Sequence, residues 1–123
     1  MNYSELSDYE INNAVAVALG AKMVNAYSVK DVRESIQYDL NGKTLLVTRG
    51  FGDGPNRFDP CNSWADAGPI IERKKICLKP AEDDRWGAIS RGPDVKLWIS
   101  DNPLRCAMIV FLMMQEVRYA EAA

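Results

Sequence analysis

The stretch that decides the fold reads NPLRCAMIVFLMM and runs from Asn102 to Met114. Asn102 is a favourable N-cap residue, and Pro103 suits the first helical position because its missing amide needs no partner there. From Leu104 onward the stretch is almost entirely apolar. A helix that is apolar nearly all round has no face to leave in water, so the rest of its domain must enclose it. The stretch therefore predicts the central and most buried helix.

A first helix is predicted near the start of the sequence. Ser7 and Glu10 have the spacing of a capping box, in which the two side chains bond free amides of the first turn. Gly20 is a natural stop for this helix, since glycine tolerates positive φ. Apolar residues between these signals recur at helical intervals and predict one buried stripe, formed by Ile11, Val15, Ala18 and Leu19.

The next part of the sequence changes to strand patterns. Asn41-Gly42 is a strong hairpin-turn signal, and residues 43–48 after it are rich in β-branched and aliphatic side chains. The partner strand is expected within residues 35–40. Residues 25–33 are ambiguous between a strand and a helix and stay unassigned. Residues 50–60 are rich in glycine and proline and predict an exposed loop.

A second helix and a second hairpin are predicted beyond this loop. The helix begins near Ser63, and Pro69 inside it predicts either a kink or a late start. The strands of the hairpin meet across the acidic turn at residues 82–84. They are expected at residues 76–78 and 86–89, with a further short strand candidate at residues 96–100.

The resulting order is helix, hairpin, helix, hairpin and helix. It predicts an α+β fold in which a small antiparallel sheet packs with about three helices. The length of 123 residues fits a single domain, residues 1–123, which can bury a core without disulfide or metal staples.

Charge and residue usage argue against several function classes. A net charge of -2 argues against DNA binding, which needs a surplus of Lys and Arg. The sequence has no histidine, so no catalytic residue is assigned. The three cysteines, Cys61, Cys77 and Cys106, form no CxxC pair, and we expect no zinc site and no activated thiol. The longest apolar run, residues 106–114, is about half of the roughly twenty residues that span a bilayer. We expect no cofactor and no membrane association.

Three phrases of the sequence resemble those of phage NinX-type proteins. They are MNYSELSD at residues 1–8, FDPCNSWADAGPII at residues 58–71 and NPLRCAMIVFLMM at residues 102–114. The similarity spans nearly the whole chain and implies a phage protein that acts in the host cytoplasm. The family is similar in turn to the first type of Thoeris anti-defence protein. That resemblance implies a homodimer or higher oligomer that holds a cyclic ADP-ribose isomer or a cyclic oligonucleotide without degrading it.

A pocket for such a ligand needs a flat surface for the purine and positive groups for the phosphates. Asn102 and Arg105 are the best matches in the sequence, because a helix N-terminus and an arginine together can hold a phosphate. The alternative interpretation is that Asn102 only caps the helix and Arg105 is only a solvated charge.

Further candidate contacts come from three other segments. Trp86 in the second hairpin could stack on a base, and Phe58 with Arg57 in the loop could close over a ligand. Arg118, near the end of the last helix, could cover a pocket on a neighbouring subunit. The alternatives are core packing for the aromatic residues and solvent exposure for the arginines.

We therefore expect a non-enzymatic protein that sequesters a nucleotide-derived immune signal. The alternative hypothesis is a protein-binding modulator or inhibitor of a host defence or recombination enzyme, which docks through the acidic turn at residues 82–84. A third hypothesis is an enzyme that cleaves the signal.

Overall fold

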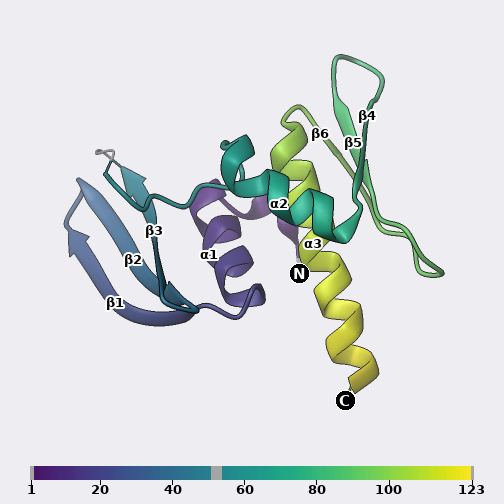
Figure 1. The fold of residues 1–123 in the computed structure, drawn as a ribbon. Helices are drawn as coiled ribbons and strands as arrows, with labels where there is room; N and C mark the ends of the chain where they lie inside the picture. Colours follow the sequence, from purple (N-terminus) through teal and green to yellow (C-terminus); the bar gives the residue numbers. More distant parts are fainter. Residues whose placement is uncertain (1, 51–53, 123) are drawn as a thin grey trace. The chain divides into compact units, whose positions relative to one another are not determined.

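A computed structural model describes the backbone of residues 2–50 and 54–122 and the side chains of residues 2–50 and 54–116. The chain divides into two compact units, Met1–Asp59 and Pro60–Ala123 (Figure 1). The first unit holds the 3-10 turn η1 (Tyr3–Glu5), α1 (Asp8–Ala18), β1 (Lys22–Val29), β2 (Arg33–Leu40) and β3 (Lys43–Gly50). The second unit holds α2 (Trp64–Lys74), β4 (Cys77–Pro80), β5 (Trp86–Ile89), β6 (Leu97–Ser100) and α3 (Pro103–Ala122).

The predicted capping box at the start of α1 is confirmed. The Glu10 amide donates to Ser7 Oγ, and the Ser7 amide donates to Glu10 Oε1, each over 3.2 Å. These hydrogen bonds lower the pKa of the Glu10 carboxyl below its ordinary value. Ile11 and Val15 of the predicted stripe are fully buried. The cap and the stripe together orient α1 within the first unit.

The first sheet is antiparallel and has the order β1-β2-β3. The predicted hairpin lies between β2 and β3, and both Asn41 and Gly42 have the positive φ that such a turn requires. Residues 25–33, which were ambiguous between a strand and a helix, contain most of β1 and the turn that joins it to β2. The sheet therefore has three strands where a two-stranded hairpin was predicted.

Pairing fixes which face of the first sheet meets α1. The Tyr38 hydroxyl donates to Asn13 Oδ1 in α1 over 2.9 Å, and the Arg49 guanidinium lies 5.7 Å from the centre of the Tyr9 ring. Side chains alternate along a strand, so the neighbours of Tyr38 in β2 point away from α1. Burial raises the pKa of the Tyr38 hydroxyl, which favours its neutral, donating form.

The second unit confirms the predicted second helix. α2 begins at Trp64, with Ser63 as its N-cap. Pro69 lies inside α2, so the prediction of a late start is wrong. The helix ends at Lys74, and the left-handed backbone of Lys75 (φ 54°) forms the C-cap.

A second antiparallel sheet, of order β4-β5-β6, packs against α3. β4 and β5 are the predicted second hairpin, and β6 is the further strand expected near residues 96–100. The prediction that α3 is the most buried helix is confirmed, since every residue from Cys106 to Val110 is 0% exposed.

The α+β class is thus confirmed, and the number of sheets is corrected. The chain forms two small three-stranded sheets, one in each unit, and the predicted single sheet is wrong. The sequence patterns are local: they indicate which neighbouring strands pair across a turn, but not whether two hairpins join in one sheet. In the part of the chain that the structure describes, no helix has both the length and the apolar character to cross a membrane.

At Gly50, the end of β3 lies very close to the turn before β2. Its φ is +100°, and a Cβ at this position would clash with the carbonyl oxygen of Val32. Gly42 has a similar φ of +90° but open space around it. We expect Gly42→Ala to lower the free energy of unfolding by about 1–3 kcal/mol, through backbone strain alone. Gly50→Ala should lower the free energy of unfolding by about 1–3 kcal/mol more, because its Cβ also overlaps the Val32 carbonyl oxygen. Urea unfolding measures both, and equal losses would contradict the close approach.

Candidate ligand pocket on the first sheet

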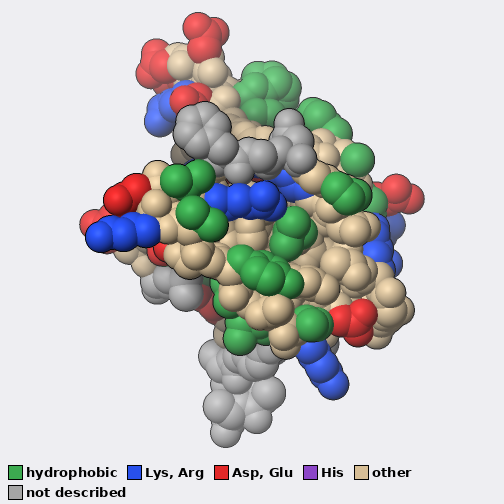
Figure 2. Space-filling view, turned by 90° about the vertical axis from the view of Figure 1, so that its left-hand side faces the viewer, with side chains coloured by type: hydrophobic (Ala, Val, Ile, Leu, Met, Phe, Trp, Pro, Cys, Tyr) green, Lys and Arg blue, Asp and Glu red, His purple; other side chains and the backbone are tan. Residues whose placement is uncertain are grey.

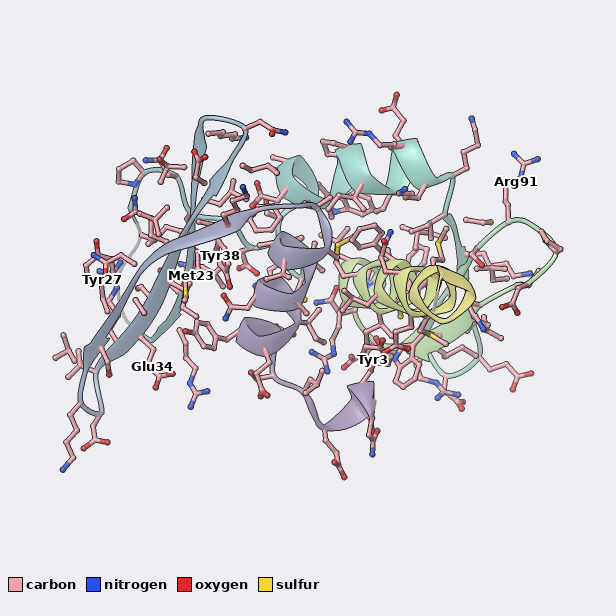
Figure 3. All side chains as sticks on the ribbon, turned by 90° about the horizontal axis from the view of Figure 1, so that it is seen from below. Tyr3, Met23, Tyr27, Glu34, Tyr38 and Arg91 are labelled. Atoms are coloured by element: carbon pink, nitrogen blue, oxygen red, sulfur yellow. The ribbon has the colours of Figure 1, made fainter. Side chains whose placement is uncertain are left out.

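The outer face of the first sheet, defined as the face turned away from α1, carries a set of polar side chains. The register places Tyr27 beside Ser35 and Ser35 beside Thr48 on this face. Gln37 lies on the same face between Asn25 and Leu46, and Arg33 lies between Val29 and Gly50. Figure 3 shows Tyr27 on the side of the sheet away from α1 and Tyr38 on the side toward it.

This outer face is hollowed into a shallow pocket of about 400 Å³. Its lining combines an aromatic ring, aliphatic side chains and hydrogen-bonding groups, which are contributed by Tyr27, Val29, Arg33, Ser35, Gln37 and Leu46. A second hollow, of about 450 Å³, lies at the hairpin end of the sheet and shares Arg33 with the first. In Figure 2, hydrophobic and basic side chains lie next to one another on this side of the molecule.

Hydrogen bonds fix the polar groups of the pocket. Arg33 Nε donates to Ser35 Oγ over 3.1 Å, and Ser35 Oγ shares a hydrogen bond with Thr48 Oγ1, also over 3.1 Å. Ser35 is only 3% exposed, so this chain of contacts is protected from water. The Arg33 guanidinium is therefore anchored to the outer face through its Nε atom.

Tyr27 and Gln37 form the other half of the pocket. The Tyr27 hydroxyl donates to Gln37 Oε1 over 3.2 Å and accepts from Asn25 Nδ2 over 3.0 Å. Because the hydroxyl is held at both sides, the ring has a defined orientation. Tyr27 is 50% exposed, so solvent reaches it.

The charge of Arg33 is not neutralised by the pocket. Across residues 2–50 and 54–116, no carboxylate forms an ion pair with Arg33. The nearby Glu34 pairs with Arg49 instead, over 3.8 Å. A half-buried guanidinium without a carboxylate attracts an anion, because water solvates it incompletely.

The predicted contact Asn102 is engaged at both ends of its amide. Its Oδ1 accepts from the amides of Leu104 and Arg105, over 3.0 and 3.2 Å, and so caps α3. Its Nδ2 donates to the Cys61 carbonyl over 2.8 Å. Asn102 thus joins the start of α3 to the segment before α2.

The structure places two other predicted contacts near Asn102. Arg105 lies in the first turn of α3 and is half-buried. Trp86 begins β5 beside Ser100, and its carbonyl accepts from Cys106 Sγ over 3.3 Å. Trp86 is 37% exposed, so part of its ring faces solvent.

The remaining predicted contacts lie elsewhere. Phe58, in the first unit, is 6% exposed, and its amide donates to the Leu46 carbonyl over 2.8 Å. Its neighbour Arg57 forms an ion pair with Asp59 at 3.6 Å. Arg118 belongs to α3, and its side chain lies outside the described residues.

Sequence reasoning missed Tyr27, Arg33 and Gln37. A usable signal was present in residues 33–37, where Arg33, Ser35 and Gln37 alternate with other residues just before the Asn41-Gly42 turn. That alternation predicts one polar face on a strand. Tyr27 had no comparable signal, because its strand is exposed on both faces.

The three thiols differ in accessibility. Cys61 and Cys106 are buried and Cys77 is exposed. Burial raises the pKa of the Cys106 thiol, although its hydrogen bond to Ser100 opposes this shift. We expect iodoacetamide to modify only Cys77 in the folded protein and all three thiols after denaturation. Peptide mass spectrometry reads the sites, and modification of native Cys106 would contradict its burial.

Asn102 is expected to stabilise the fold through two separable contacts. Asn102→Ala removes the cap and leaves the Cys61 carbonyl without this donor, which should cost about 2–3 kcal/mol in the free energy of unfolding. Asn102→Ser keeps a capping oxygen and should recover about 1 kcal/mol of that loss. Chemical unfolding compares them, and an unchanged stability in Asn102→Ala would show that neither contact matters.

The chain matches a model of a known protein family. The family described as Bacteriophage P22, NinX matches residues 2–115 of the chain. A search of curated proteins gives no significant match to this chain.

Proposed function

The chain belongs to the Bacteriophage P22 NinX family, and from this membership and the outer-face pocket we propose that it sequesters a nucleotide-derived immune signal. The signal would be a cyclic ADP-ribose isomer or a cyclic oligonucleotide, held without turnover in the host cytoplasm. The observation that carries the proposal is the Arg33 guanidinium, held in a pocket where no carboxylate of residues 2–50 and 54–116 forms an ion pair with it.

The pocket chemistry suits a nucleotide in three respects. Arg33 can bond two phosphate oxygens at once, which a lysine cannot do in that geometry. The half-exposed Tyr27 ring offers a stacking surface, worth roughly 1–3 kcal/mol per base. Gln37 carries an amide that can meet the polar edge of a base.

The same lining favours holding the ligand over cleaving it. The pocket that contains Tyr27 and Gln37 is lined by hydroxyl, amide, guanidinium and aliphatic groups. None of these groups is a strong general base at neutral pH. A ligand bound there would keep its phosphate bonds, so the protein would act stoichiometrically.

The pocket is a better candidate than the start of α3. Both Oδ1 and Nδ2 of Asn102 form hydrogen bonds within the fold, so this amide has little remaining capacity to bond a base edge. Among the described residues, Arg33 donates a side-chain hydrogen bond only through Nε, to Ser35, which leaves its terminal nitrogens for a ligand. Binding at Asn102, Arg105 and Trp86 stays a prediction of the sequence.

A second candidate function follows from the acidic turn between β4 and β5. Glu82, Asp83 and Asp84 are all exposed there, and both aspartates have positive φ. A basic surface of a host defence or recombination enzyme could dock on this turn. A pull-down from host lysate would favour this function if it gave a stable protein partner and no released small molecule.

Isothermal titration with cyclic ADP-ribose isomers and cyclic di- and trinucleotides tests the proposed sequestration. Arg33→Gln should weaken binding about ten- to hundredfold, because it removes charge-assisted hydrogen bonds to phosphate. Arg91→Gln is the control, since Arg91 is an exposed arginine in the second unit and outside the pocket lining (Figure 3). It should bind as the unmodified protein does.

Flat titrations across the whole panel would contradict the proposal. Equal weakening by the two variants would contradict the site. Mass spectrometry of ligand recovered after heating separates sequestration from cleavage, and a shortened or opened ligand would show that the protein is an enzyme.

A further inference from the structure

The residues paired directly with Arg33 do little to hold its side chain. They are Val29 on β1 and Gly50 on β3. A valine side chain has no hydrogen-bonding atom, and a glycine has no side chain. A long arginine side chain with such neighbours samples several rotamers unless another group fixes it, and ordering it on binding costs affinity. The orientation of Arg33 therefore depends on contacts with residues other than its direct partners.

The contact that holds Arg33 comes from the next residue on the same face of β2. Arg33 Nε donates to Ser35 Oγ over 3.1 Å. Residues two apart on a strand share a face, so the strand itself brings these two groups together. A serine hydroxyl rotates freely and can turn toward another partner. Ser35 therefore holds Arg33 only if Ser35 is held in turn.

Thr48 on the neighbouring strand holds Ser35. The two residues are directly paired in the β2–β3 ladder, and their hydroxyl oxygens share a hydrogen bond over 3.1 Å. Threonine is branched at Cβ, so its χ1 torsion is stiff. Ser35 is only 3% exposed, so water does not readily replace this bond. Thr48 thus gives the Ser35 hydroxyl a fixed partner.

Charge gives these contacts a preferred direction. The Arg33 Nε–H can only donate, so Ser35 Oγ accepts from it. A hydroxyl that accepts from a cation becomes a stronger donor, which favours donation of the Ser35 proton to Thr48 Oγ1. Without the Thr48 hydroxyl, the buried Ser35 proton needs another acceptor. Turning toward that acceptor would draw the Ser35 lone pair away from Arg33.

We propose that Thr48 is a positioning residue, which acts through Ser35 to hold the Arg33 guanidinium in place for an anion. The single proton on Nε is engaged by Ser35, so the edge that can bond two oxygens at once is the one formed by Nη1 and Nη2. A phosphate would bind end-on along this edge. The role in ligand binding rests on the proposed function, whereas the hold on Arg33 does not.

Hydrogen exchange of the Arg33 Nε–H, followed by NMR in the ligand-free protein, tests the hold on Arg33. A buried hydrogen bond slows exchange, so this proton should exchange at least about tenfold more slowly than that of the exposed Arg91. Thr48→Val keeps the shape of the side chain without the hydroxyl and should speed Arg33 exchange at least about threefold. Thr48→Ser keeps a hydroxyl and should restore most of the protection.

Thr44→Val is the matched control. Thr44 and Thr48 are both half-buried on β3, and their spacing of four residues places them on the same face. Thr44 lies outside the pocket lining, so Arg33 exchange should not change in this variant. Equal exchange in Thr48→Val and Thr44→Val would overturn the proposal, and so would an Arg33 Nε–H that exchanges as fast as that of Arg91. Circular dichroism checks folding, and Thr48→Ala replaces Thr48→Val if the latter does not fold.

Titration with inorganic pyrophosphate measures the consequence for binding. Thr48 itself does not line the pocket, so its effect on binding must pass through Ser35. Thr48→Val should weaken the affinity about three- to tenfold, because the guanidinium must then be ordered on binding. Thr48→Ser and Thr44→Val should bind as the unmodified protein does. Equal affinities of Thr48→Val and Thr44→Val would overturn the positioning role. Absence of pyrophosphate binding together with a protected Arg33 Nε–H would contradict only the proposed function.

Discussion

Antiparallel pairing of β2 with β3 is the constraint on which the first unit depends. The pairing alternates side chains between two faces, so Tyr38, Leu45 and Val47 are buried while Arg33 and Gln37 point outward. A shift by one residue would exchange the two faces. The Asn41-Gly42 turn sets this register and thereby sets which residues reach the pocket.

The outer face combines two features that a folded protein normally avoids. A half-buried guanidinium has no carboxylate partner in the described part of the chain, and an adjacent strand exposes large apolar side chains. Each feature costs stability in the isolated chain. A bound anion would compensate the first feature.

The second unit illustrates how one residue type can suit both a structural role and a binding role. Asn102, Pro103 and Arg105 have the residue types of a phosphate site at a helix N-terminus. In the folded chain, Asn102 caps α3 and bonds the Cys61 carbonyl, while ligand binding at Asn102 stays a prediction. A side chain with a donor and an acceptor is chemically suited both to capping a helix and to binding a ligand. Only the position of its hydrogen-bond partners in the folded chain shows which groups it contacts.

Local sequence alone determined the helices, the capping box and the Asn41-Gly42 hairpin, because each depends on residues a few positions apart. It also determined that α3 would be buried, since an apolar helix has no solvent-compatible face. Only the tertiary structure decided that β1 is a strand and that Tyr27, Arg33 and Gln37 share one pocket. β1 has no buried face to impose a pattern, and the pocket arises from strand pairing between residues that no local signal relates.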